Sequence, residues 1–171
     1  LTYLLAIFFL ANYELFSVFK KKSTILFLDL ILILSLYTIY YLIDASSSSY
    51  YLILWIIILV VCSDVGGYVF GKTFKWKKIT KISPKKTLSG VFGSFIFSLI
   101  SVFIANSIFS FQSFVIFLQP KYFFLSIIFS LVAQGGDLTI SYFKRLEKIK
   151  DTGKILPGHG GIFDRIDGLM F

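Results

Sequence analysis

The chain has 171 residues, of which 57% are hydrophobic and 15% are charged, and its mean hydropathy is +0.84. Soluble globular domains contain about 45–50% apolar and about 25% charged residues, so this composition excludes an ordinary soluble domain. The net charge of +8 is compatible with a nucleic-acid-binding protein or with a membrane protein whose loops are basic on one side. The hydropathy favours the membrane protein.

Apolar runs of about twenty residues predict an all-α protein, a polytopic transmembrane helical bundle. Taken in chain order, the expected spans are residues 1–19, 24–43, 50–70, 89–109 and 121–143, and a further apolar run begins shortly before Phe171. We therefore expect a single membrane domain over residues 1–171 with about five to six transmembrane helices. The chain starts at Leu1 and stops inside an apolar run, so we expect this domain to be incomplete at both ends.

Basic residues gather on one side of this predicted topology. Alternating spans place residues 20–23, 71–88 and 144–165 on the same side, and that side holds all of the 17 Lys and Arg residues except Lys121. Cytoplasmic loops of membrane proteins carry an excess of Lys and Arg. The three loops are therefore expected in the cytoplasm, with a polar site on that side of the membrane.

Four acidic residues lie inside the predicted spans: Glu14, Asp29, Asp64 and Asp137. Each is six to eight residues from a lysine at the cytoplasmic boundary, which at a helical rise of about 1.5 Å per residue puts it roughly 10 Å inside the membrane. Charged residues at such depth are costly and usually functional. For Glu14 and Asp29 an isolated polar defect near a helix end is an equal alternative.

Asp64 and Asp137 differ from the other two acids because each lies beside a pair of glycines. The stretches are "SDVGGYVFG" (63–71) and "AQGGDLTIS" (133–141). Paired glycines in a membrane helix allow another backbone or a ligand to come close. An aspartate next to each pair favours a polar pocket over plain helix packing.

The loop between the third and fourth spans contains the segment "SPKKT" (83–87). Its proline fixes a turn that presents two ammonium groups and two hydroxyls together, and these are suitable partners for phosphate oxygens. The other lysines of this loop are explained by attraction to anionic lipid. The segment predicts phosphate binding by Ser83, Lys85, Lys86 and Thr87.

The longest polar stretch is "KDTGKILPGHGGIFDRID" (150–167). Asp164 and Asp167 are three residues apart and would share one face of a helix, which we expect near Asp137. Carboxylates in such a cluster are the hard oxygen ligands that Mg²⁺ takes, with substrate phosphates completing its coordination. The pattern predicts metal-assisted phosphoryl or nucleotidyl transfer. His159 is either a participant or a residue that only hydrogen-bonds the loop.

These motifs together resemble a known family. "SYFKRLEKIKDTGKILPGHGGIFDRID" (141–167), preceded by "DVGGYVFGK", "ISPKKT" and "QGGDLTIS", is similar to the signature of the phosphatidate cytidylyltransferase (CDP-diacylglycerol synthase) family. The resemblance covers about residues 60–168, the expected catalytic core. Many members have an acidic residue where this chain has Ser89, which puts a role for an acid there in doubt.

The resemblance implies a function. The expected reaction converts CTP and phosphatidic acid into CDP-diacylglycerol and diphosphate, in the bacterial inner membrane, with Mg²⁺ and with K⁺ as an optional second cation. A homodimer is left open, and no nucleic-acid partner is expected. The implied metal ligands are Asp137 and Asp164. The implied catalytic residues are Asp137, Asp164, Asp167, Lys144, Arg145 and His159. The implied substrate-binding residues are Asp64, Ser83, Lys85, Lys86, Thr87, Lys150, Asp151, Gly160, Gly161 and Arg165.

Two alternatives remain at this level. A CTP-dependent lipid kinase of the polyprenol type would also bind a nucleotide and a lipid at the membrane, but it would release CDP. A cation-coupled transporter would use the buried acids without any nucleotide. No internal repeat is found in the sequence, so a transporter built from inverted repeats has no support.

Overall fold

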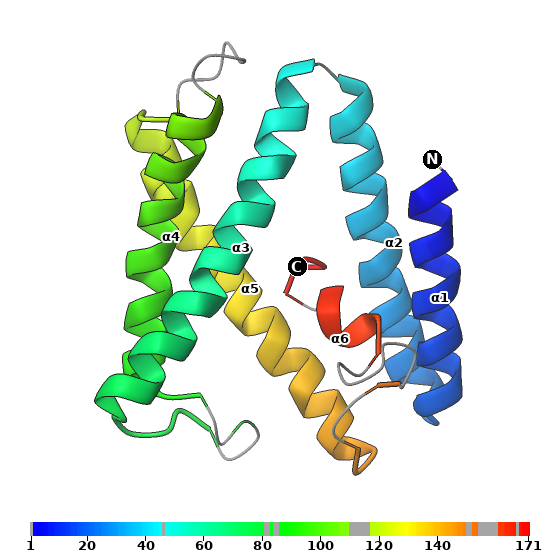
Figure 1. The fold of residues 1–171 in the computed structure, drawn as a ribbon. Coiled ribbons are helices and arrows are strands. Elements are labelled where there is room, and N and C mark those ends of the chain that lie inside the picture. The colour runs from blue at the N-terminus through cyan, green and yellow to red at the C-terminus, as the bar shows by residue number, and fades with distance from the viewer. Residues whose placement is uncertain are drawn as a thin grey trace. The chain divides into compact units, whose positions relative to one another are not determined.

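The computed structural model describes residues 2–45, 47–80, 83, 86–109, 117–149, 152–153, 161–166 and 168–171, with only the backbone of residues 45, 47, 48 and 165. Its helices, in chain order (Figure 1), are α1 (Thr2–Val18), α2 (Lys22–Ala45), α3 (Ser47–Phe74), α4 (Leu88–Phe109), α5 (Pro120–Leu146) and α6 (Phe163–Ile166). The chain forms two compact units, which are described separately below. Unit 1 comprises Leu1–Tyr41 and Gly135–Phe171, and unit 2 comprises Leu42–Gln134.

Among the residues that the structure describes, four helices are long and apolar enough to cross a membrane: Lys22–Asp44, Ser49–Phe74, Leu88–Phe109 and Pro120–Leu146. They confirm the last four predicted spans to within a few residues at each end. Helix α1 has 17 residues, fewer than the about 20 that a membrane crossing needs, so the predicted first span stays a prediction. The chain is an all-α integral membrane protein.

In unit 2, small residues bring α3 and α4 side by side (Figure 1). A Cβ atom on Gly67 would lie 2.7 Å from Ser94 Oγ, so these helices leave no room for a side chain there. The Ser94 hydroxyl donates to the carbonyl of Ser63 at 2.8 Å, and the hydroxyls of Ser63 and Ser130 lie 2.8 Å apart and join α3 to α5. The glycine pair that follows Asp64 therefore serves helix packing.

Trp55 forms the centre of the unit 2 core. It is 2% exposed, and its ring lies 5.7 Å from that of Phe117, 5.2 Å from that of Tyr122 and 6.0 Å from that of Phe129. Such ring pairs add to the free energy gained by burying their large apolar area. They fix α3, α5 and the residues before α5 to one another.

Unit 1 contains α1, most of α2, the second part of α5 and α6. Its buried core consists of Ala11, Leu15, Phe19, Leu28, Leu32, Ile140, Phe163 and Met170. The turn between α1 and α2 reaches the end of α5, because the backbone N–H groups of Lys20 and Lys21 each lie 3.4 Å from Glu147 Oε1. The starts of two basic loops therefore lie at the same end of this unit, which is compatible with the predicted charge asymmetry.

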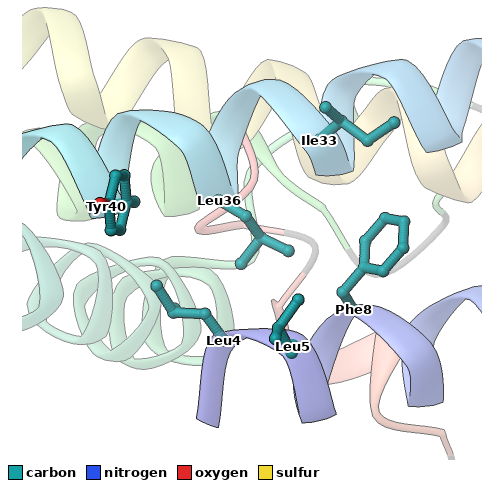
Figure 2. Close-up of a pocket in the computed structure, with 6 residues that line it drawn as sticks. All are labelled: Leu4, Leu5, Phe8, Ile33, Leu36 and Tyr40. Atoms are coloured by element: carbon teal, nitrogen blue, oxygen red, sulfur yellow. The ribbon is translucent and has the colours of Figure 1, made fainter. Parts of the chain in front are cut away.

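An apolar groove of about 250 Å³ lies between α1 and α2 in unit 1 (Figure 2). Its lining residues are Leu4, Leu5, Phe8, Ile33, Leu36 and Tyr40. Apart from the Tyr40 hydroxyl, these side chains offer no hydrogen-bonding group.

Candidate functional site

Asp164, in the short helix α6, has a buried carboxylate with a nitrogen donor on each oxygen. Lys144 Nζ donates to Asp164 Oδ1 at 2.8 Å. The backbone N–H groups of Thr152 and Gly161 donate to Asp164 Oδ2 at 2.8 and 3.0 Å. The side chains of Lys144 and Asp164 are each 10% exposed. The end of α5 and the segment before α6 are therefore held together by one carboxylate.

The surroundings of Asp164 lower its pKa. Burial alone would raise the pKa of this carboxyl group, because a low dielectric disfavours its charged form. The hydrogen bond from Lys144, the two backbone hydrogen bonds and the positive charge of Lys144 outweigh burial, and the pKa falls below its ordinary value of 3.8. Asp164 is therefore an anion at neutral pH, paired with the ammonium group of Lys144.

A second carboxylate, that of Glu14 in α1, is bound to the two residues directly before Asp164. Glu14 Oε1 accepts a hydrogen bond from the N–H of Ile162 at 3.0 Å, and Glu14 Oε2 accepts one from the N–H of Phe163 at 2.9 Å. The first N–H groups of a helix have no partner within that helix. Glu14, which is 1% exposed, supplies the acceptors that the start of α6 lacks.

Two glycines allow the segment to approach the Glu14 carboxylate. A Cβ atom on Gly153 would lie 2.6 Å from Glu14 Oε1, and one on Gly161 would lie 2.5 Å from Glu14 Oε2. The same position on Gly161 is 2.7 Å from Thr152 Oγ1. The hydroxyl of Thr152 is buried and has no hydrogen-bond partner within the part of the chain that the structure describes. Gly161, predicted to bind substrate, is thus required here for close packing.

Arg145 does not join Asp164 and Lys144. Its guanidinium group is exposed, and Nη1 donates to the carbonyl of Ile149 at 2.9 Å. Consecutive residues of a helix point in directions about 100° apart, so only Lys144 of this pair faces Asp164. Arg145 instead stabilises the turn that follows α5.

Asp137 is half-buried on α5, and the hydroxyl of Ser141 lies 3.5 Å from its Oδ1. Asp137 and Lys144 are seven residues apart, about two helical turns, and so lie on the same side of α5. No group of three or more His, Cys, Asp or Glu side chains able to hold a metal ion occurs among the described residues. The predicted metal ligands, Asp137 and Asp164, therefore belong to no such group within the described residues.

The donor chemistry of these two residues still fits a hard cation. A carboxylate has about four acceptor positions on its two oxygens, and the described donors use three of them on Asp164. The remaining position is on Oδ1, the oxygen that also binds Lys144. Asp137 and Asp164 could therefore contribute oxygen ligands to Mg²⁺, with other oxygens completing its coordination.

In unit 2, the described residues among those predicted to bind phosphate make contacts within the protein. The Thr87 hydroxyl accepts a hydrogen bond from the N–H of Gly90 at 3.2 Å, which is the arrangement of an N-cap for α4. Lys86 Nζ donates to the carbonyl of Gln134 at 3.3 Å. Ser83 lies in the preceding turn, where its carbonyl accepts from the N–H of Lys86 at 3.0 Å. Asp64 is exposed on α3.

The remaining predicted site residues lie outside the described part of the chain. They are Lys85, Lys150, Asp151, His159, Gly160, Asp167 and the side chain of Arg165.

Sequence reasoning singled out Glu14 as an acid in an apolar helix but assigned no role to it, and it did not single out Thr152. The partners of Glu14 are backbone N–H groups 148 and 149 residues later in the chain. Backbone groups leave no pattern in side-chain spacing, so only the fold reveals this contact.

The chain matches the model of the cytidylyltransferase family over residues 1–171. It is 44% identical over 117 residues to a phosphatidate cytidylyltransferase of Helicobacter pylori, an alignment that covers 67% of this chain and 41% of that protein. It is 42% identical over 110 residues to that of Rickettsia typhi (63% and 48%) and 42% identical over 115 residues to that of Staphylococcus haemolyticus (67% and 43%). The matched part is less than half the length of each of these curated relatives. The chain belongs to the cytidylyltransferase family, the assignment that its motifs had predicted.

Proposed function

We propose that this protein is a phosphatidate cytidylyltransferase, which converts CTP and phosphatidic acid into CDP-diacylglycerol and diphosphate in phospholipid biosynthesis. The observation that carries the proposal is the family match over the whole chain, with relatives of that name at 42–44% identity. The same proposal places the protein in a bacterial inner membrane with its site facing the cytoplasm, and it includes a homodimer as the assembly to test.

The chemistry of this reaction suits the groups around Asp164. A phosphatidate oxygen attacks the α-phosphorus of CTP, the bond from that phosphorus to the bridging oxygen breaks, and diphosphate leaves with the bonding electrons. The attacking oxygen is already anionic near neutral pH, so the step needs little help from a base. The main difficulty is the approach of two anions, which fixed positive charge and correct placement relieve.

Lys144 provides positive charge in this proposal. It is buried, and Asp164 holds its ammonium group at 2.8 Å. Because the backbone N–H groups of Thr152 and Gly161 fix Asp164 in turn, the position of Lys144 is set before substrate binds. A preorganised cation stabilises developing charge without reorganising during the reaction.

Mg²⁺ is the proposed cofactor, with K⁺ as an optional second cation. Asp137 and Asp164 would hold Mg²⁺, which would neutralise charge on the triphosphate of CTP. Lys86 and Thr87 of unit 2 remain proposed phosphate-binding residues, although Thr87 also caps α4.

The test uses membranes that contain the protein, supplied with CTP labelled on the α-phosphate, phosphatidic acid and Mg²⁺. The expected result is labelled lipid and unlabelled diphosphate, both lost when EDTA removes the metal. Asp164→Asn is expected to lose most of this activity, whereas the matched control Glu147→Gln, at an exposed turn, is expected to retain it.

Other products would contradict the proposal. Labelled CDP together with an unlabelled phosphorylated lipid would indicate a lipid kinase. Cation uptake into proteoliposomes without nucleotide, and no labelled lipid, would indicate a transporter. Labelled lipid formed equally well in EDTA would rule out the proposed metal.

A further inference from the structure

We propose that Glu14 is a positioning residue: its carboxylate fixes the segment that carries Asp164, and so sets where the Asp164 carboxylate lies relative to Lys144. This inference rests on the proposed function. It assigns to α1, which lies outside the motifs of the sequence signature, a part in placing the polar site.

The first observation is that Glu14 binds the segment at two adjacent points. Its two oxygens accept hydrogen bonds from the N–H groups of Ile162 and Phe163, at 3.0 and 2.9 Å. These are the two residues directly before Asp164. A carboxylate bound through both oxygens to consecutive N–H groups fixes the direction of the backbone as well as its position.

The second observation is that the same two short stretches of backbone, at residues 152–153 and at Gly161, contact both the Glu14 and the Asp164 carboxylates. Gly161 packs against Glu14 so closely that a Cβ atom would lie 2.5 Å from its Oε2, and the N–H of Gly161 donates to Asp164 Oδ2 at 3.0 Å. Gly153 likewise packs against Glu14 Oε1, and the N–H of its neighbour Thr152 donates to Asp164 at 2.8 Å. A displacement at Glu14 is therefore passed to both backbone donors of Asp164.

The third observation concerns the origin of the acceptor. The start of a helix is usually capped by a Ser, Thr, Asp or Asn side chain next to it in sequence. At α6 the acceptor is instead a buried carboxylate from a helix 148 residues away. Burying a carboxylate is costly, and a local cap would serve a purely structural purpose. The distant acceptor adds a fixed link between α1 and the Asp164 segment.

Glu14→Gln is the informative variant because glutamine has the same shape. One of its two terminal atoms still accepts a hydrogen bond, but the other becomes an NH₂ group that faces a second N–H donor. Glu14→Ala removes both acceptors. Misplacing a reactive group by about 1 Å can cost on the order of 100-fold in rate, so we expect kcat to fall about 10- to 100-fold in Glu14→Gln and further in Glu14→Ala. The KM for CTP should change less than about threefold, because kcat depends most on placement.

The experiment combines kinetics with hydrogen–deuterium exchange on the same preparations of wild-type protein, Glu14→Gln, Glu14→Ala and the control Glu147→Gln. In both Glu14 variants, we expect faster exchange in peptides that cover residues 161–166, with unchanged exchange in α3 and α4. Glu147→Gln should change neither kcat nor exchange in those peptides.

Each outcome supports or overturns the inference. Unchanged kcat in Glu14→Gln with an active wild-type protein overturns it, and so does faster exchange throughout the chain, which would indicate general unfolding. A rise in the KM for CTP with unchanged kcat would also overturn it. If the wild-type protein forms no labelled lipid, the proposed function fails, while exchange at residues 161–166 still shows whether Glu14 fixes the segment.

Discussion

Lys144 Nζ lies 2.8 Å from Asp164 Oδ1, and both side chains are 10% exposed. This ion pair joins the end of the long helix α5 to the short helix α6, across twenty residues of sequence. Backbone N–H groups satisfy the other carboxylate oxygen, so the pair meets the condition under which a buried ion pair offsets its desolvation cost. Removing either partner would leave a buried charge without compensation.

We therefore expect Lys144→Met and Asp164→Asn each to destabilise the protein and to reduce turnover. Breaking one side of a buried ion pair costs about 3–5 kcal/mol. The double variant Lys144→Met/Asp164→Asn should be more stable than the sum of the two changes predicts, because it leaves no unpaired charge. Thermal unfolding in detergent measures this coupling. The exposed Lys148→Gln is the control, and additive losses in the double variant would mean that the two groups do not interact.

The lowered pKa of Asp164 predicts how stability depends on pH. Below its ordinary value of 3.8, an unfolded carboxyl group takes up a proton while the folded one stays ionised. The unfolded state then binds more protons, so stability rises with pH in this window. The contribution of Asp164 to the free energy of unfolding is complete above pH 3.8 and is lost as the pH falls through the lower pKa of the folded state.

The measurement is the unfolding temperature between about pH 2.5 and 5, compared for wild-type protein and Asp164→Asn. The wild-type curve should be steeper in acid, and the difference between the two proteins should be constant above the window. Parallel curves over the whole range would show that Asp164 has no lowered pKa.

Replacing glycine with alanine is expected to affect stability differently at Gly161 and at Gly135. A Cβ atom on Gly161 would lie 2.5 Å from Glu14 Oε2, whereas one on Gly135 would meet nothing within 4 Å. Glu14 is held by two hydrogen bonds and cannot move away freely, so Gly161→Ala should cost about 1–3 kcal/mol through overpacking. Gly135→Ala should be neutral or slightly stabilising, because alanine is the better helix former by up to about 1 kcal/mol. Equal unfolding temperatures for the two variants would contradict the close packing.

Thr87 is expected to act as the N-cap of α4. Thr87→Ala should destabilise the protein by about 1 kcal/mol, the usual cost of losing such a cap, and Thr87→Ser should restore most of it. Thr73→Ala is a matched control, since the Thr73 hydroxyl is exposed and binds the carbonyl of Val69 within α3. Hydrogen exchange at the N–H of Gly90 reports the cap directly, and slow exchange in Thr87→Ala would show that another group caps the helix.

Much of the fold follows from local properties of the sequence. Apolar runs of about twenty residues identified the four membrane-spanning helices, because hydrocarbon thickness sets the length that such a run must have. The charges predicted that the turn after α1 and the end of α5 lie on the same side of the membrane, and the contact of the Lys20 and Lys21 backbone with Glu147 is compatible with that prediction. The motifs around residues 141–167 indicated the family.

The contacts of the site's side chains do not follow from local sequence. Lys144 and Arg145 were both predicted to hold phosphate, and in the structure Lys144 binds Asp164 while Arg145 donates to the carbonyl of Ile149. The glycines next to Asp64 favoured a polar pocket, which stays a prediction, and the structure shows that Gly67 packs against Ser94 of α4. In both cases the sequence names suitable residues, but the direction of each side chain depends on the neighbour that the fold supplies.

The sequence by itself determined that this is an all-α membrane protein of the cytidylyltransferase family, because hydropathy, charge asymmetry and motif spacing are properties of short stretches. Only the tertiary structure decided which hydrogen-bond donors each buried carboxylate binds. Glu14 holds the backbone of Ile162 and Phe163, and Asp164 holds Lys144. A buried carboxylate requires donors within hydrogen-bonding distance, and which donors come that close is settled by how α1, α5 and α6 pack in unit 1.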